Sequence, residues 1–197
     1  MFSENQQVKL RKRTSNPHNS LPIMNNPNTF KVDGQDHINI WEKGQTKLGQ
    51  FLSHGSHSPF HHPVLGMFNN VESFWHYIRS QERDDRIRTM NNIGAKKFST
   101  QLHTVKVPNF YAIIMDTNYI KLKEYPEMLT LFKENELPLE MYFIYKDKGV
   151  RIRPSFAVWV LEGFKEIKKA LNEDREPDFT FLLEKPTDDL YSFFTNQ

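Results

Sequence analysis

Cysteine is missing from this chain of 197 residues, and its absence removes several kinds of chemistry. Without cysteine there is no disulfide framework and no thiolate nucleophile, and any metal site would have to use histidine or carboxylate ligands. A chain that has no disulfide to maintain fits a reducing compartment. We therefore expect a cytoplasmic protein.

Long apolar runs are missing as well. The longest are short pieces such as Tyr142-Phe143-Ile144-Tyr145, far below the roughly 20 residues that a helix needs to cross a bilayer. The first residues contain no apolar core of the kind found in signal peptides. We therefore expect a protein that is neither secreted nor embedded in a membrane.

The sequence also lacks the motifs of several common enzyme classes. It contains no phosphate-binding loop, no GxGxxG dinucleotide-binding pattern and no GxSxG elbow. These motifs bring backbone N–H groups or a nucleophile to a defined place, and without them nothing supports an NTPase, a dehydrogenase or an α/β-hydrolase. We find no internal repeat.

Enough apolar side chains are present for one core of ordinary size. Hydrophobic residues make up 38% of the chain and aromatic residues 13%, including 16 phenylalanines. At this length we expect one domain and do not expect two well-packed cores. The fold class that we predict is α+β, a mostly helical single domain with a few short strands.

The two ends of the chain differ in charge and composition from the middle. Residues 1–36 are rich in Asn, Gln, Ser and Pro and are interpreted as a flexible basic arm. Residues 37–171 form the predicted domain. Residues 172–197 hold seven acidic and two basic side chains but also several aromatic ones, so this tail is expected to dock on the domain or on a partner.

The basic cluster of the arm is a candidate nucleic-acid contact. It consists of Lys9, Arg11, Lys12 and Arg13. Basic arms bind the phosphates of nucleic acids through charge alone. The alternative is a solvated tail that only keeps the protein in solution.

Apolar periodicity predicts most of the domain as helix. Val71, Phe74, Trp75 and Ile78 follow the spacing of one helix face, with Asn70 placed as its N-cap. Other helices are predicted around residues 93–98, from Pro108 in the first turn to about Lys123, from Pro126 onward, and after Pro154 to Leu171.

Strands are predicted in two places. Residues 37–41 alternate like a half-buried strand, which we expect to continue through residues 47–52. Residues 139–146 are aromatic and β-branched, and Asp147-Lys148-Gly149 predicts a turn into a second strand at residues 150–153.

Histidine draws attention first, because His54, His57, His61 and His62 lie within nine residues. Imidazole is a common metal ligand. However, the cluster has no helical i, i+4 pair and no nearby carboxylate in the same loop, so it matches no zinc pattern. We predict no metal site.

Glu72 and a lysine pair are the other candidates for chemistry. Glu72 falls in the first turn of the predicted helix, with Trp75 three and His76 four residues later. The helix dipole could steer its carboxylate, or the side chain could simply face solvent. Lys96 and Lys97 could bind phosphate or form a solvated pair.

The order of these pieces resembles the NADAR family, also called YbiA-like. The resemblance extends over roughly residues 38–171 and is carried by Phe51-Leu52-Ser53 with Ser58-Pro59-Phe60, Asn70 to Tyr77, Gly94-Ala95-Lys96-Lys97, Tyr125 to Leu129, and Ile167 to Leu171. His54 stands where the family has Asn, His76 or Tyr77 stands near its Gln, and a late Trp-Gly segment is not found.

The resemblance implies a function and a set of residues. Members of the family cleave N-glycosidic bonds in ribosylated compounds and in ADP-ribosylated guanine. Glu72 then matches the catalytic carboxylate, and the substrate-binding residues would be Ser53, His54, Phe60, Trp75, His76, Lys96 and Lys97. No cofactor or metal is required. The expected partner is an ADP-ribosylated nucleobase, nucleotide or DNA.

Two functional hypotheses follow from the sequence. The first is an N-glycosidase that removes ADP-ribose from guanine, in a phage or anti-toxin setting where it counters an ADP-ribosyltransferase toxin. The second is a non-catalytic protein on the same fold that binds ADP-ribose, nucleic acid or a toxin protein. Only the first requires Glu72 to face a cavity within reach of the sugar carbon.

Overall fold

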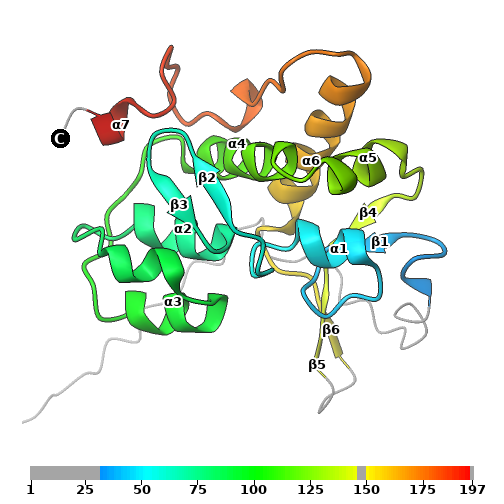
Figure 1. Cartoon of the computed structure of the whole chain (residues 1–197), viewed down its shortest axis with the longest axis horizontal. Coiled ribbons are helices and arrows are strands. Elements are labelled where there is room, and N and C mark those ends of the chain that lie inside the picture. Colours follow the sequence, from blue (N-terminus) through cyan, green and yellow to red (C-terminus); the bar gives the residue numbers. More distant parts are fainter. Residues whose placement is uncertain (1–31, 146–149, 196–197) are drawn as a thin grey trace, which may run out of the picture.

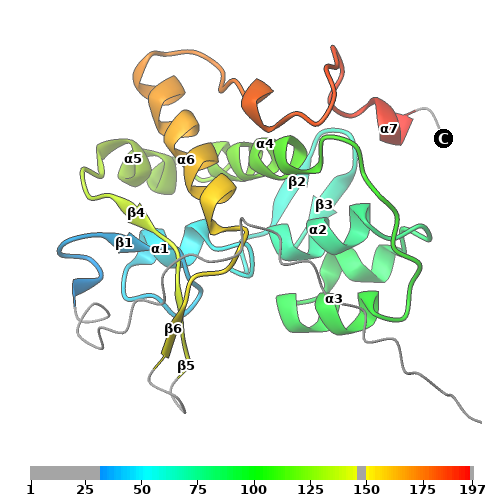
Figure 2. The same cartoon turned by 180° about the vertical axis from the view of Figure 1, so that it is seen from behind.

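A computed structural model describes residues 32–145 and 150–195. It has the predicted class, a mostly helical α+β single domain with a few short strands. Helix α4 runs through the middle of the domain and α6 crosses it (Figures 1 and 2). The helices are α1 (Lys47–Leu52), α2 (Val71–Ile78), α3 (Asn92–Ser99), α4 (Phe110–Lys123), α5 (Pro126–Glu134), α6 (Ala157–Asn172) and α7 (Ser192–Thr195), with 3₁₀ turns at Asp85–Thr89 and Thr180–Leu182.

The strands form three separate pairs in the described part of the chain. Strand β1 (Ile38–Asn39) pairs in parallel with β4 (Leu139–Glu140). Strands β2 (Phe60–His62) and β3 (Gly66–Phe68) form one antiparallel hairpin. Strands β5 (Phe143–Tyr145) and β6 (Val150–Ile152) form another, which extends away from the helices (Figure 1).

The late hairpin is confirmed, although the strand predicted over residues 139–146 is divided. Between β4 and β5 the side chains of Met141 and Tyr142 are both buried. The backbone N–H of Tyr142 donates to the side chain of Asn39 at 3.0 Å, and Asn39 donates back to the Tyr142 carbonyl at 3.2 Å. This amide clamp ends the pairing with β1. The predicted turn at residues 147–149 lies outside the described residues.

Local capping explains where α2 and α3 begin. Asn70 accepts the N–H of Ser73 at 2.7 Å, which confirms the predicted cap of α2. Asn91 accepts the N–H of Gly94 at 2.7 Å and starts α3 in the same way. Each cap satisfies an N–H that the first turn of a helix otherwise leaves without a partner.

The strand expected over residues 47–52 is wrong, because this segment is helix α1. Thr46 caps it by accepting the N–H of Gly49 at 3.0 Å. Leu48, Phe51 and Leu52 share one buried face, which is a helical spacing. A Cβ on Gly49 would lie 2.2 Å from the Asn39 carbonyl, so only glycine lets the helix approach β1 this closely.

Helix α4 begins two residues after Pro108, which is therefore not in its first turn as predicted. Asn109 lies between them with φ at 54°, in the left-handed region. Its side-chain oxygen accepts the N–H groups of Glu184 at 2.9 Å and Lys185 at 3.0 Å. The side chain of Asn109 therefore binds the C-terminal segment and does not cap α4. This contact with residues far along the chain sets the start of the helix.

The buried side chains form two clusters rather than the single core expected. One gathers around α1, α5 and α6, and the other around α2 and the β2–β3 hairpin. Helix α4 contributes to both, with Met115 and Leu122 in the first and Ile113 and Ile114 in the second. Trp159 packs against both clusters, so they are held together in one domain.

The segment after α6 docks on the domain, which settles one of the two alternatives for the tail. Phe179 and Leu182 join the first cluster, and Phe194 joins the second. The hydroxyl of Tyr191 donates to the carboxylate of Asp116 on α4. Burial raises the pKa of Asp116. The tail therefore covers one side of α4 (Figure 1).

Candidate active site

A cavity of about 530 Å³ lies where the starts of α2 and α3 face the β5–β6 hairpin and the loop after α1. This is within the range of roughly 300–1,000 Å³ typical of small-molecule sites. Trp41, Phe143 and Phe156 supply aromatic walls. The polar lining consists of Glu42, Lys43, Ser53, His54, Glu72, Asn92 and Lys96.

Glu72 is the carboxylate on the α2 side of this cavity. It is the second residue of the helix, and its backbone N–H donates to the carbonyl of His54 at 2.9 Å. Its side chain is 28% exposed, so one part faces the cavity and another faces protein. The backbone bond joins the two lining segments and holds Glu72 beside His54.

His76 lies one helical turn after Glu72 on α2 and contacts its carboxylate. Its Nε2 lies 3.4 Å from the Glu72 carboxylate, and its Nδ1 lies 2.9 Å from the hydroxyl of Ser99 at the end of α3. The same Ser99 hydroxyl donates to the carbonyl of Lys96 at 2.9 Å, so it links the His76 ring to the end of α3. His76 is therefore a positioning group and is not part of the cavity lining.

The charge state of Glu72 follows from these neighbours. Burial alone raises the pKa of Glu72, but the contact with His76 and the nearby His54 and Lys96 together outweigh it. The result is a pKa below the ordinary value for glutamate. Glu72 is thus a carboxylate at neutral pH, suited to stabilise positive charge or to accept a proton, not to donate one.

His54 is neutral at the same pH. It is 5% exposed, and burial lowers its pKa to about 4. Its Nε2 lies 3.1 Å from the side-chain nitrogen of Asn118 on α4, which can only donate, so the proton of the neutral ring is on Nδ1. His54 offers the cavity a polar but uncharged wall.

Another part of the cavity lining is held by a contact between distant segments. Asn92 at the start of α3 donates its side-chain N–H to the carboxylate of Glu42. Gly55 passes beside this pair, and a Cβ there would lie 2.6 Å from the Asn92 nitrogen and 2.9 Å from the Glu42 oxygen. Any larger residue at position 55 would push the two apart.

Two lysines give the cavity its positive charge. Lys43 and Lys96 both line it and are both exposed. Neither forms an ion pair with a carboxylate of residues 32–145 or 150–195. Unpaired ammonium groups at the edge of a cavity suit an anionic ligand such as a phosphate.

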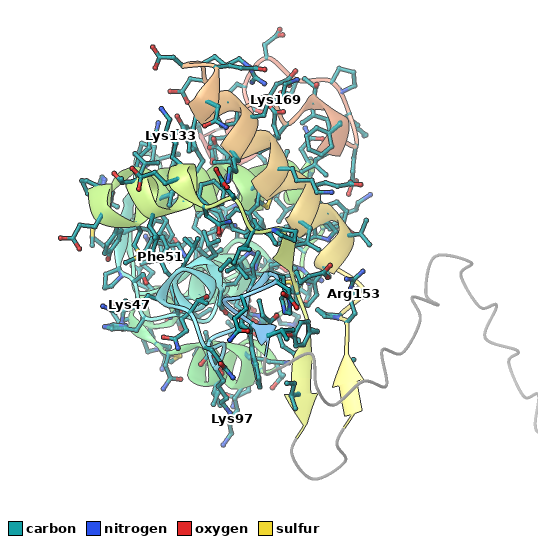
Figure 3. The ribbon with its side chains drawn as sticks, turned by 90° about the vertical axis from the view of Figure 1, so that its right-hand side faces the viewer. Lys47, Phe51, Lys97, Lys133, Arg153 and Lys169 are labelled. Carbon is teal, nitrogen blue, oxygen red and sulfur yellow. The ribbon has the colours of Figure 1, made fainter. Side chains whose placement is uncertain are left out.

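The cavity therefore brings together Glu72, Ser53, His54 and Lys96 from the set predicted by sequence, with His76 in contact. Three others lie elsewhere. Phe60 is fully buried against Phe68 and Phe74. Trp75 lines a different cleft, and Lys97 lines a groove on another side of α3, where it points away from the molecule (Figure 3).

Helix geometry explains these differences. Neighbouring residues on a helix point about 100° apart, so Lys96 and Lys97 cannot both face one cavity. Trp75 turns toward α4 and α6, where its ring packs against Phe110 and Trp159. Glu42 and Asn92 were missed by the sequence reasoning, because they are 50 residues apart and no local pattern connects them.

The four histidines of the cluster take different places in the fold. No group of three His, Asp or Glu side chains among the described residues could hold a metal ion. His62 is instead fully buried and stacks on Phe74, and burial lowers its pKa to about 4. The nucleic-acid contacts predicted at Lys9, Arg11, Lys12 and Arg13 lie outside the described residues.

No family model, curated protein or solved structure matches this chain. Within the described residues, none of the helices combines the length and the apolar character needed to span a membrane. The chemistry of the cavity itself is therefore the basis for a function. It combines an ionised carboxylate, a neutral imidazole, aromatic walls and two ammonium groups that pair with no carboxylate of the described residues.

Proposed function

We propose that this protein is an N-glycosidase of the NADAR type, which hydrolyses the bond between ADP-ribose and a nucleobase in DNA or in a nucleotide. The observation that carries the proposal is the ionised Glu72 carboxylate at a cavity of about 530 Å³ that also holds Lys96. A cytoplasmic setting, in which the enzyme reverses guanine ADP-ribosylation by a toxin, is part of the proposal.

The reaction needs a negative charge beside the sugar. As the N-glycosidic bond breaks, positive oxocarbenium character builds up on the anomeric carbon and its ring oxygen. A carboxylate stabilises this charge more strongly in the transition state than in the substrate, which is the condition for faster reaction. The same carboxylate can accept a proton from the attacking water. Glu72 is proposed for both roles.

The remaining groups of the cavity are assigned to binding. Lys43 and Lys96 are proposed to contact the pyrophosphate, since neither is neutralised by an ion pair with a described carboxylate. Trp41 or Phe143 would pack against the adenine or the ribose. His54, with its proton on Nδ1, is a neutral hydrogen-bonding group for a sugar hydroxyl.

Glu72→Gln tests the proposal. The variant is incubated with a DNA oligonucleotide that carries ADP-ribosylated guanine, and released ADP-ribose is measured by chromatography. Loss of the charge is expected to lower the rate by about 10²- to 10⁴-fold, the usual contribution of such a group. Glu127→Gln is the matched control, because Glu127 is the second residue of α5 as Glu72 is of α2 and is exposed.

The alternative function gives a different result in the same experiment. A non-catalytic binder of ADP-ribose would bind the modified oligonucleotide tightly and release nothing. Wild-type protein that neither binds nor releases ADP-ribose contradicts both functions.

A further inference from the structure

A second cleft, of about 640 Å³, is lined by Trp75, whose ring centroid lies 6.0 Å from that of His54 in the Glu72 cavity. It is formed by α2, the start of α4, the start of α6 and the segment at residues 104–107. Phe156 lines both this cleft and the Glu72 cavity. The two hollows are therefore neighbours that share one aromatic wall. We call the second one the aromatic groove.

Five aromatic rings line the aromatic groove: Trp75, Phe110, Tyr111, Phe156 and Trp159. The rings of Trp75 and Trp159 are stacked with centroids 6.0 Å apart, and Tyr111 lies 4.8 Å from Trp159. Tyr111 is 41% exposed, which is unusual for a ring that packs against other aromatics. Tyr111 is therefore the ring of the groove that is most open to solvent, and the Trp159 ring supports it.

The groove also has an unpaired positive charge. The guanidinium of Arg79 lies 5.6 Å from the centre of the Phe110 ring and forms no ion pair with a carboxylate in the part of the chain that the structure describes. The other cation, Lys106, is neutralised by Glu184 at 2.9 Å. Arg79 is thus the group left to attract an anion at this edge.

We propose that the aromatic groove binds an unpaired base of single-stranded DNA, next to the nucleotide held at Glu72. Every base has a flat face that stacks on aromatic side chains, and the phosphate attached to it would meet Arg79. The shared wall at Phe156 makes the two hollows neighbours, which is the arrangement that adjacent nucleotides of one strand would need. The choice of DNA rests on the proposed function, whereas the stacking surface does not.

The test measures the binding of a short, unmodified, fluorescently labelled DNA strand by anisotropy. Tyr111→Ala is expected to weaken binding by about five-fold to a hundred-fold, the range found when one stacking ring is removed. Tyr111→Phe keeps the ring and is expected to bind like the wild type. Phe181→Ala is the control for an exposed ring elsewhere, since Phe181 is 52% exposed and outside the groove.

Arg79 is tested by its salt dependence. In Arg79→Gln the slope of log affinity against log salt concentration is expected to be less steep by about 0.7, the value for one phosphate contact with a single strand. Lys133→Gln removes an exposed charge on α5 and is expected to leave the slope unchanged. Thermal melting checks that each variant is folded.

Three results overturn the inference. They are the absence of binding by the wild type, unchanged binding by Tyr111→Ala, and binding of the matching RNA strand in preference to DNA. The unmodified strand contains no ADP-ribose, so the change that Tyr111→Ala makes in its binding reports on the groove. Release of ADP-ribose from a free modified nucleotide reports on the Glu72 cavity. Strand binding without any release would contradict the proposed function but agree with base binding in the groove. Release without strand binding would support the proposed function and contradict base binding in the groove.

Discussion

Lys121 on α4 allows a quantitative prediction, because it is a fully buried lysine without a carboxylate partner among the described residues. It is 1% exposed, and its ammonium donates to the carbonyl of Phe51 at 2.7 Å and lies 4.6 Å from the centre of the Phe51 ring. That carbonyl belongs to the end of α1, from which Ser53 and His54 enter the Glu72 cavity. Burial lowers the pKa of Lys121 to about 7.

The direction of the effect follows from proton binding. Between the folded pKa of about 7 and the unfolded value of about 10.4, the unfolded chain binds more protons at this site than the folded chain does. The free energy of unfolding therefore rises with pH over this window. From pH 7 to pH 9 the two pKa values give a gain of about 2 kcal/mol from Lys121 alone.

Lys121→Met removes this dependence and keeps a side chain of similar length. The variant loses one of two donors to the Phe51 carbonyl, the other being the Ser56 hydroxyl at 3.0 Å, at a cost of about 0.5–1.5 kcal/mol that does not depend on pH. Relative to the wild type, its stability is therefore expected to fall by about 2 kcal/mol between pH 7 and pH 9. Urea unfolding followed by circular dichroism at pH 7, 8 and 9 measures the constant loss of stability and the part that changes with pH.

Lys133→Met is the control, because Lys133 is exposed on α5. Its stability is expected to follow the wild type at every pH. Parallel curves for wild type and Lys121→Met would refute the reasoning, since they would mean that Lys121 has the same pKa in both states.

Three further predictions concern the site, the tail and the arm. Ser99→Ala removes the partner of His76 Nδ1 as well as a bond to the Lys96 carbonyl, and is expected to slow ADP-ribose release by about fivefold, the equivalent of about 1 kcal/mol. Thr100→Ala, which loses only the corresponding bond to the Lys97 carbonyl, is the control for both rate and melting temperature, and equal rates would show that His76 needs no anchor. Tyr191→Phe leaves Asp116 without its donor, so urea unfolding is expected to show a loss of about 1–3 kcal/mol; no loss would mean that the tail is held by its apolar contacts alone. Deletion of residues 1–31 is expected to weaken DNA binding and to reduce its salt slope by about 0.7–0.9 for each phosphate that the arm neutralises in the full chain, and identical slopes would exclude the arm. The deletion ends at residue 31 because Asp33 is bonded to the domain. Its carboxylate accepts the N–H groups of Asn39 at 2.9 Å and Gln45 at 2.7 Å.

The features predicted correctly from the sequence are those that neighbouring residues determine. The cap at Asn70, the apolar face of α2 and the start of α5 at Pro126 each depend on contacts within one or two turns. The segment at residues 47–52 shows the limit of such reasoning. Six residues with several apolar side chains fit either a strand or a helix, and the Thr46 cap with the close approach of Gly49 to Asn39 decides for the helix.

The composition of the site was only partly predictable, because it depends on contacts between distant segments. The sequence indicates Glu72 and Lys96, but nothing local shows that Glu42 meets Asn92 or that Phe156 closes the cavity. Phe60 was assigned to the site, whereas packing against Phe68 and Phe74 buries it completely. In the same way, a contact from the tail at Glu184 sets the left-handed Asn109 before α4.

The charge of Glu72 favours an enzyme over a simple binder, and this difference can be measured. ADP-ribose carries negative phosphates, so an ionised carboxylate in the same cavity weakens its binding and helps only when positive charge develops on the sugar. Glu72→Gln is therefore expected to bind ADP-ribose more tightly than the wild type while it cleaves far more slowly. Removing one repulsion of about 1 kcal/mol corresponds to a roughly fivefold lower dissociation constant by calorimetry. Weaker binding by Glu72→Gln would mean that the carboxylate holds a ribose hydroxyl in the ground state, and its role as a stabiliser of the transition state would have to be given up.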